Sequence, residues 1–474
     1  MNNFKYLKFD NIPPVSYTLD ITSTIHRRFN MSDLKQLFND YQKDFAHSRK
    51  GNERAEWFLY TLFAIILPYA SAKTSLVLRI LKSVFGFIGM TGRRFYTFMG
   101  SPKLPWDRLW KTTRTSIPDH LTDGRALIAI DDSINPKTGK NIFACHQFFD
   151  HAAKENQAKY PWSQNIVMAG LLTKIKNRWA CLPLACRFYQ PQNSLENKDI
   201  RVGKDKVVFK TKLEQATDMV VEIYNDIKKP IIGITDSWFG NDGLFGPTKK
   251  LLGENFNLLA RLRCNININD LPKTSATKKK GRPRKYGNLL GNVADLASLF
   301  RDKAKTYVVD LYGQSRDVVA YDQVVMLKNL KCPVRVVWVY RKTKWIALFS
   351  TDLTLSVNQI IEYYGARWKI EAGFKELKQD IGSSQAQCRN PHAVINHINF
   401  CMMAVTVTWI YAMQLKKAPS RQHAVKGRRH YAFSDVRREF AKDITSDSFH
   451  AFCPYERKSG LKSIAPALLG LLGW

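Results

Sequence analysis

Residues 126–132 read ALIAIDD, an apolar run that ends in two carboxylates. Apolar stretches of this length are typical of buried strands, whereas Asp is rare inside strands. The run therefore predicts a buried strand that ends at Asp131 and Asp132. PIIGITDSWF (230–239) repeats the pattern and places Asp236 at the end of a second strand. A carboxylate in this position is either a turn residue or part of a functional site.

The segments around these two strands alternate between strand and helix patterns. NIVMAGLLT (165–173) and WACLPLACRFY (179–189) are separated by a short polar turn, which predicts a hairpin. KLEQATDMVVEIYNDIKK (212–229) and LFGPTKKLLGE (244–254) predict helices, and NLLARLRCN (257–265) predicts a further strand. We therefore predict an α/β fold, in which a mixed sheet is flanked by helices. Such sheets carry their functional sites at the ends of strands.

The composition points to a polyanionic partner. The 474 residues include 73 Lys and Arg against 40 Asp and Glu, which gives a formal net charge of +33. This excess is far more than solubility requires, and it favours nucleic acid as the partner. Basic residues gather between Arg93 and Arg114, at the end of a region with helical patterns. That region is interpreted either as a duplex-binding module or as a helical domain with a solvated basic face.

Several other classes of protein are disfavoured by the sequence. No C-x-x-C pair occurs among the eight Cys, so a zinc cage is not expected. No G-x-x-x-x-G-K-[ST] motif occurs, so we expect chemistry that does not use ATP. The uncharged segment 57–72 is short for a membrane span and contains Pro68, so it is interpreted as a buried helix. Without an apolar signal-peptide core at its start, the chain is expected to be cytoplasmic and nucleoid-associated.

The segment YYGARWKIEAGFKELK (363–378) carries the most specific pattern in the chain. At about 100° per residue, one narrow stripe of a helix carries five functional side chains. These are Tyr364, Arg367, Glu371, Lys375 and Lys378. One interpretation is an exposed, salt-bridged helix face, because Arg367 and Glu371 form an i,i+4 pair. The other is a site that binds metal ions and phosphates.

The second interpretation has a chemical reason. Two divalent ions that clamp a scissile phosphate need about three carboxylates, and Mg²⁺ prefers oxygen ligands. Asp132, Asp236 and Glu371 are the candidate ligands. The phenol, guanidinium and ammonium groups on the same stripe are suited to binding neighbouring phosphates.

The spacing Tyr364-x2-Arg367-x3-Glu371-x6-Lys378 resembles the Y-R-E-K signature of bacterial insertion-sequence transposases in the DDE superfamily. IDDS (130–133) and TDSWF (235–239) stand where that family has its first and second aspartates, and Ser133 replaces a Thr that is frequent there. The similarity covers about residues 125–415. It implies an RNase H-like mixed sheet flanked by helices, with a β-rich insertion and a helical N-terminal domain.

The domain division that we predict follows from these patterns. It comprises a helical DNA-binding domain (1–122), the first part of an RNase H-like catalytic core (123–269), a β-rich insertion (270–345), the second part of the core with the Y-R-E-K helix (346–415) and a basic C-terminal tail (416–474). Within the core, a long helix is expected at about 355–380 and an apolar helix at about 391–414.

The resemblance also implies an activity. It predicts a cut-and-paste transposase that binds two Mg²⁺ ions, for which Mn²⁺ can substitute, and that needs neither ATP nor a membrane. Its partners are double-stranded DNA, both the terminal inverted repeats of a transposon and the target, and a second copy of the chain in a synaptic homodimer. The implied metal ligands are Asp132, Asp236 and Glu371. Asp131 is the alternative to Asp132, because successive strand residues face opposite sides of a sheet.

Two further signals concern DNA. Trp345 stands where relatives carry an aromatic side chain that replaces a flipped base, although a core Trp on a strand is the other interpretation. GRPRK (281–285) resembles the core of an AT-hook, and we expect Arg282, Arg284 and Lys285 to contact phosphates. Two rival functions remain open: a transposase-derived DNA-binding protein without activity, and an RNase H-like nuclease such as a junction resolvase.

Overall fold

The structure is a computed structural model that describes most of the chain. The described residues are 32–68, 72–150, 153–196, 199–272, 284–423, 430–445 and 455. Arg282 and most of the predicted basic tail lie outside these residues.

Five strands form the centre of a mixed sheet. They are β1 (Ala126–Pro136), β3 (Trp162–Ile175), β4 (Arg178–Tyr189), β7 (Ile231–Thr235) and β8 (Phe256–Arg261). β3 runs antiparallel to both of its neighbours, β1 and β4. β7 runs parallel to β1, and β8 runs parallel to β7. Their order across the sheet is β4–β3–β1–β7–β8. The predicted hairpin is therefore confirmed, and β7 ends directly before Asp236 as predicted. The prediction that the first strand ends at Asp132 is wrong, because β1 stays paired with β3 through Pro136.

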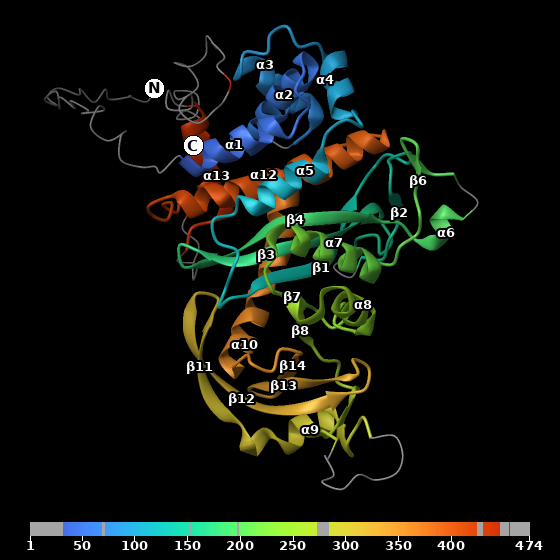
Figure 1. The fold of residues 1–474 in the computed structure, drawn as a ribbon, viewed down its shortest axis with the longest axis vertical. Helices are drawn as coiled ribbons and strands as arrows, with labels where there is room; N and C mark the ends of the chain where they lie inside the picture. Colours follow the sequence, from blue (N-terminus) through green and yellow to red (C-terminus); the bar gives the residue numbers. More distant parts are fainter. Residues whose placement is uncertain are drawn as a thin grey trace, which may run out of the picture.

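Helices cover both faces of this sheet. α7 (Lys212–Ile227) packs on β3 and β4, and α8 (Asp242–Leu252) packs on β8 and α7, in front of the sheet in Figure 1. On the other face lie α11 (Trp368–Lys375) and α12 (Pro391–Gln414). A three-stranded antiparallel meander followed by two parallel strands with intervening helices is the RNase H-like arrangement, so the predicted fold class is confirmed.

The β-rich insertion continues the same sheet. Its strands are β9 (Asn267–Asn269), β10 (Leu289–Asn292), β11 (Lys305–Leu311), β12 (Gln314–Leu327), β13 (Cys332–Arg341) and β14 (Lys344–Ser350), with α9 (Val293–Leu299) between β10 and β11. β14 pairs with β8, so the insertion is joined to the core by backbone hydrogen bonds. The combined sheet has 12 strands among the described residues, and the insertion forms its lower part in Figure 1.

A helical layer lies at the opposite end of the molecule. It contains α1 (Ser32–Lys43), α2 (Arg49–Ile66), α3 (Thr74–Ser83), α4 (Gly92–Met99), α5 (Trp106–Thr115) and α13 (Phe433–Thr445). α12 contacts α2, α4 and α5 on one side and β4 on the other, so it links this layer to the sheet (Figure 1). α12 is long and apolar enough to cross a membrane, but 83% of its most apolar window is buried inside the protein. It is the shared core helix of the two parts.

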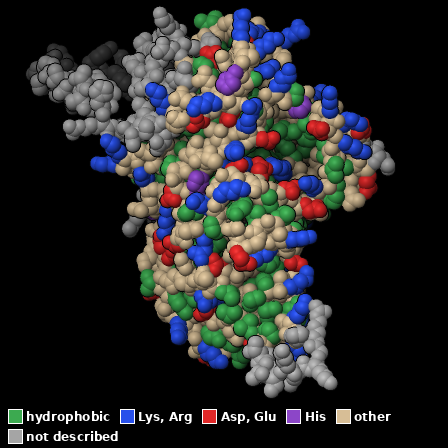
Figure 2. All heavy atoms as spheres, in the orientation of Figure 1, with side chains coloured by type: hydrophobic (Ala, Val, Ile, Leu, Met, Phe, Trp, Pro, Cys, Tyr) green, Lys and Arg blue, Asp and Glu red, His purple; other side chains and the backbone are tan. Residues whose placement is uncertain are grey.

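Small elements complete the described fold. They are β2 (Cys145–Gln147), α6 (Gln192–Leu195) and a hairpin of β5 (Arg201–Val202) and β6 (Asp205–Lys206). Lys and Arg side chains are spread over the visible face from the helical layer to the insertion (Figure 2). The net positive charge is therefore not confined to one domain on this face.

A buried arginine fixes the helical layer to the sheet. Arg114 of α5 has a side chain that is only 1% exposed. Its guanidinium donates to Glu222 and Asp226 of α7 and to the carbonyl of Leu184 on β4. Because the guanidinium is fully paired, the cost of burying its charge is compensated by several charge-assisted hydrogen bonds.

We predict that Arg114→Met destabilises the protein by about 3 kcal/mol, because two carboxylates lose their buried partner. The change would be measured as the shift in urea unfolding free energy. Arg94→Met is the matched control, since Arg94 pairs with Glu53 on the surface and such pairs contribute less than about 1 kcal/mol. Equal effects of the two substitutions would contradict the prediction.

Candidate active site

The middle of β1 and the end of β7 bring three aspartates together. In the parallel register of these strands, Ala129 lies opposite Ile234. Two residues further along each strand come Asp131 and Asp236, so they occupy the same level of the sheet. Asp132 follows on β1 and points to the opposite face, because side chains alternate along a strand.

Asp131 faces the helix that carries the Y-R-E-K residues. The Arg367 guanidinium lies 3.2 Å from the Asp131 carboxylate and 3.0 Å from that of Glu371, so it bridges the two. Burial, together with the negative charge of Asp236, raises the pKa of Asp131 to about 7. Burial also raises the pKa of Glu371, and Asp236 adds to this effect. Asp236 therefore lies within electrostatic range of the two carboxylates that Arg367 bridges.

Asp132 lies among different partners on the other face of the sheet. Its Oδ2 accepts hydrogen bonds from Lys212 Nζ at 2.8 Å and from Asn165 Nδ2 at 2.7 Å. The sequence favoured Asp132 as the metal ligand, but the structure places the alternative, Asp131, beside Asp236 and Glu371.

Asp236 is held by the turn that follows β7. Its Oδ1 accepts from the backbone N–H groups of Trp238 at 2.9 Å and Phe239 at 3.0 Å. The turn interpretation is therefore confirmed, and because only one carboxylate oxygen orders the turn, it does not exclude a site role for Asp236.

The predicted long helix is interrupted, and that prediction is corrected here. α10 (Val357–Ala366) ends before Arg367, α11 follows it, and a short π-helix, η4 (Glu376–Asp380), closes the segment. Arg367 thus sits at the junction, where its guanidinium also lies near the rings of Tyr364 at 5.7 Å and Trp368 at 5.6 Å. Burial raises the pKa of Tyr364, so its phenol stays protonated as a hydrogen-bond donor.

The two lysines of the stripe have different environments. Lys378 donates to Ser133 Oγ at 2.6 Å and to the carbonyl of Ile134 at 2.7 Å, which ties the π-helix to the end of β1. Burial lowers the pKa of Lys378 to about 8. Lys375 is exposed, and its charge acts on Asp380 instead. The structure therefore joins Lys378 to the carboxylate cluster and leaves Lys375 outside it.

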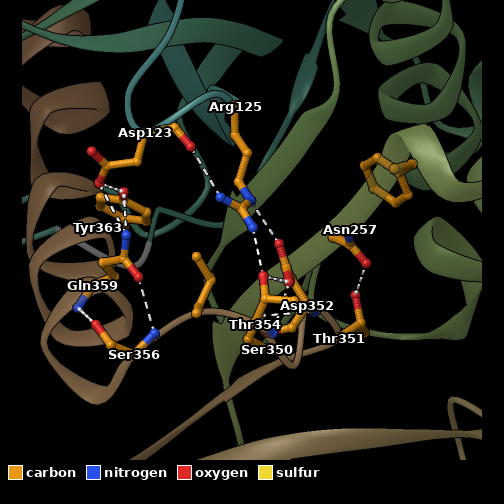
Figure 3. A network of polar contacts seen from close by, with 12 residues as sticks. Asp123, Arg125, Asn257, Ser350, Thr351, Asp352, Thr354, Ser356, Gln359 and Tyr363 are labelled. Atoms are coloured by element: carbon orange, nitrogen blue, oxygen red, sulfur yellow. Dashed lines mark hydrogen bonds and ion pairs between the residues drawn. The ribbon is translucent and has the colours of Figure 1, made fainter.

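The start of α10 is fixed by a network at the other end of β1 (Figure 3). Tyr363 donates to Asp123, which precedes β1, and Gln359 donates to the same carboxylate at 3.1 Å. Arg125 binds Asp352, which follows β14, at 2.7 Å. Since Tyr364 directly follows Tyr363, this network sets the position of the helix that carries the site.

We predict that Tyr363→Phe lowers the unfolding free energy by about 1.5–3 kcal/mol, since it removes a hydrogen bond to a charged group. Urea unfolding would measure it. Tyr312→Phe is the control, because Tyr312 is 58% exposed. A smaller loss for Tyr363→Phe than for the control would contradict this role.

The remaining predicted DNA contacts lie further out. Trp345 is the second residue of β14 and is half-buried, three residues before Leu348, which pairs with Arg261 at the end of β8. It therefore lies at the same edge of the sheet as the carboxylates but on a more distant strand. Arg284 and Lys285 are exposed in the insertion, consistent with contact to a flexible polyanion.

Sequence reasoning missed several residues of this site. Asp131, Asp132 and Asp236 line a cleft of about 640 Å³ with Lys212, Asn165, Phe149, Asp150 and Trp238. Arg261 acts electrostatically on Tyr364. Trp238 belongs to the quoted TDSWF motif, whereas Lys212, Asn165, Phe149 and Asp150 are distant from the carboxylate motifs in sequence and reach the cleft only through the fold.

The carboxylates of Asp131, Asp236 and Glu371 are ligands of the type that a hard divalent cation prefers. Among the described residues, no three Asp, Glu, His or Cys side chains are assembled closely enough to hold a metal ion as they stand. Arg367 occupies the position between Asp131 and Glu371, so a guanidinium serves as their present counter-cation. Asp236 repels both carboxylates that Arg367 bridges, and three carboxylates with one guanidinium between two of them favour further positive charge.

The sequence matches the DDE superfamily endonuclease family over residues 45–309, which is more than half of the chain. The chain belongs to the DDE superfamily of endonucleases. The matched region contains helices α2 to α5 of the helical layer, both aspartate strands and part of the insertion. It ends before Glu371, so the Y-R-E-K assignment rests on spacing and geometry. No curated protein matches the chain significantly.

Members of this superfamily cut DNA with the help of divalent metal ions, and DNA is therefore the substrate that the family implies. The RNase H-like sheet and the basic composition are consistent with that substrate. A nuclease-type function is thus established at the level of the family.

Proposed function

We propose that this endonuclease is a DNA transposase that cleaves a strand at each transposon end and joins the freed 3′-hydroxyl to target DNA. The observation that carries the proposal is that Arg367 bridges Asp131 and Glu371, while Asp236, directly after β7, lies close enough to raise the pKa of both. These groups come from three segments that are far apart in sequence. An exposed salt-bridged helix would not require them to meet.

Asp131, Asp236 and Glu371 would hold the divalent cation, with Mg²⁺ as the natural ion and Mn²⁺ able to replace it. When bound there, the ion stabilises negative charge on the attacking and leaving oxygens of phosphoryl transfer. Asp236 is already oriented by two backbone N–H groups, so its position costs little rearrangement.

The basic and phenolic groups would bind the strand. Lys378 is tied to the end of β1, and its remaining N–H group can donate to a phosphate oxygen next to the carboxylates. The Tyr364 phenol is a donor on the other side of Arg367. Trp345 would accept a base displaced from the duplex by stacking. Lys375, Arg282, Arg284 and Lys285 would supply more distant phosphate contacts.

We further propose the partners and compartment that this chemistry needs. Cut-and-paste joining acts on two transposon ends, so the active assembly would be a homodimer on terminal inverted repeats and target DNA. The reaction exchanges phosphodiester bonds and needs no ATP. The protein would act in the cytoplasm on the nucleoid.

A supercoiled plasmid carrying the element and its flanking repeats tests the proposal. With Mg²⁺, we expect excision of the element and its joining to a second plasmid. Cutting without joining would support the RNase H-like nuclease instead. Binding of the ends with neither reaction would support a DNA-binding protein that has lost catalysis.

A further inference from the structure

Asp132, the second of the two successive aspartates on β1, forms an ion pair with a lysine. Lys212 Nζ lies 2.8 Å from Asp132 Oδ2, and Asn165 donates to the same oxygen. Among the described residues, neither Asp131 nor Asp236 forms an ion pair with this lysine. Asp131 pairs with Arg367 instead, so the two successive aspartates of β1 have separate cations, Arg367 for Asp131 and Lys212 for Asp132.

Lys212 is held rigidly for a lysine. It is the first residue of α7, whose start is fixed by a capping box between Thr211 and Glu214. Its ammonium lies 5.2 Å from the centre of the Tyr189 ring and 5.5 Å from that of Trp238, so two aromatic faces flank it. Such contacts stabilise a cation in a defined place. Its side chain is only 19% exposed.

The neighbouring Lys210 shows the contrast. It pairs with Asp218 on the surface, and its side chain is 51% exposed. Two lysines at the same helix start thus differ in environment: one extends into solvent, and the other is enclosed over the cleft that Asp131, Asp132 and Asp236 line.

The enclosed position of the Lys212 ammonium matters for the chemistry proposed for the cleft. Phosphoryl transfer with two metal ions places two cations on a cluster of carboxylates. Asp131, Asp132, Asp150 and Asp236 line the cleft, and Asp132 is already neutralised by an ammonium whose remaining N–H groups can rotate toward a ligand. An additional divalent ion on Asp132 Oδ2 would have to displace both Lys212 and Asn165.

We infer that Lys212 is a resident cation of the active-site cleft, which occupies on Asp132 the position that a second divalent ion would otherwise take. The inference rests on the proposed metal-dependent function. It differs from the expectation of two bound ions: one metal binds among Asp131, Asp236 and Glu371, and the Lys212 ammonium supplies the second positive charge.

Counting bound Mn²⁺ tests the inference without any cleavage. The full-length protein is stripped of metal and titrated with Mn²⁺, and the free ion is followed by electron paramagnetic resonance. We expect about one tightly bound ion per chain in the unmodified protein and about two in Lys212→Gln, because Asp132 becomes available. Lys210→Gln is the matched control and should bind about as many ions as the unmodified protein.

Two further variants keep the test decisive if Lys212→Gln folds poorly. Lys212→Arg retains the cation and should remain at one ion, and Asp132→Asn should also remain at one. Two ions on the unmodified protein, or a loss of its ion in Asp132→Asn, would overturn the inference while leaving metal-dependent function intact. No bound ion in any variant would overturn both the inference and the proposed metal chemistry.

Discussion

Replacing Asp236 by Asn is expected to lower the rate of strand cleavage roughly a thousand-fold or more, because several kcal/mol of transition-state stabilisation depend on the metal that it would bind. The fold should survive the change. Asp236 Oδ1 accepts from the N–H groups of Trp238 and Phe239, and the amide oxygen of Asn can accept the same bonds. The substitution therefore removes charge without removing the turn.

Single-turnover cleavage of an end-containing duplex measures this effect, with end binding followed in EDTA as a separate readout. Binding should change little, since most contacts between protein and DNA involve the phosphate backbone. Asp242→Asn is the matched control, because Asp242 lies nearby in α8 and pairs with Lys331 at the surface. Cleavage by Asp236→Asn within about tenfold of the unmodified rate would refute the assignment.

Much of this site was predictable because its elements have strong local signals. The apolar runs that end at Asp132 and Asp236 appear as β1 and β7. The hairpin and the helix before the second strand follow the same local rules of alternation and period. Their order then limits the sheet to few topologies, since connections are short and parallel crossovers are right-handed.

What the sequence did not reveal depends on tertiary contacts. Periodicity predicts one helix through residues 355–380, whereas the helix is interrupted at Arg367 and its last segment is a π-helix. Arg367 is buried between Asp131 and Glu371, and this pairing outweighs local helix preference. Lys212 is 80 residues from Asp132, so only the packing of α7 on the sheet brings them together.

The choice between Asp131 and Asp132 was open in the sequence for a related reason. Because side chains alternate along a strand, only one of two successive carboxylates can face a given helix. The alternation does not determine which of the two it is. The packing of α11 on one face and α7 on the other decides this, since Arg367 contacts Asp131 and Lys212 contacts Asp132. The family spacing favours Asp132, and the geometry favours Asp131.

A comparison of Asp131→Asn with Asp132→Asn should separate these assignments. We expect Asp131→Asn to lower cleavage roughly a thousand-fold, because it removes a carboxylate from the group formed with Asp236 and Glu371. Asp132→Asn should cost only about tenfold, because it weakens the hold on Lys212 and leaves that group intact. Single-turnover cleavage at saturating Mg²⁺ measures both variants under the same conditions.

The two variants serve as controls for each other, since they are adjacent, equal in size and lose the same charge. A non-specific effect of reduced negative charge in the cleft would lower both rates alike. The reverse order of effects would assign the metal to Asp132 and would require Lys212 to leave Asp132 when the ion binds. The ratio of the two rates therefore reports which face of β1 carries the catalytic carboxylate.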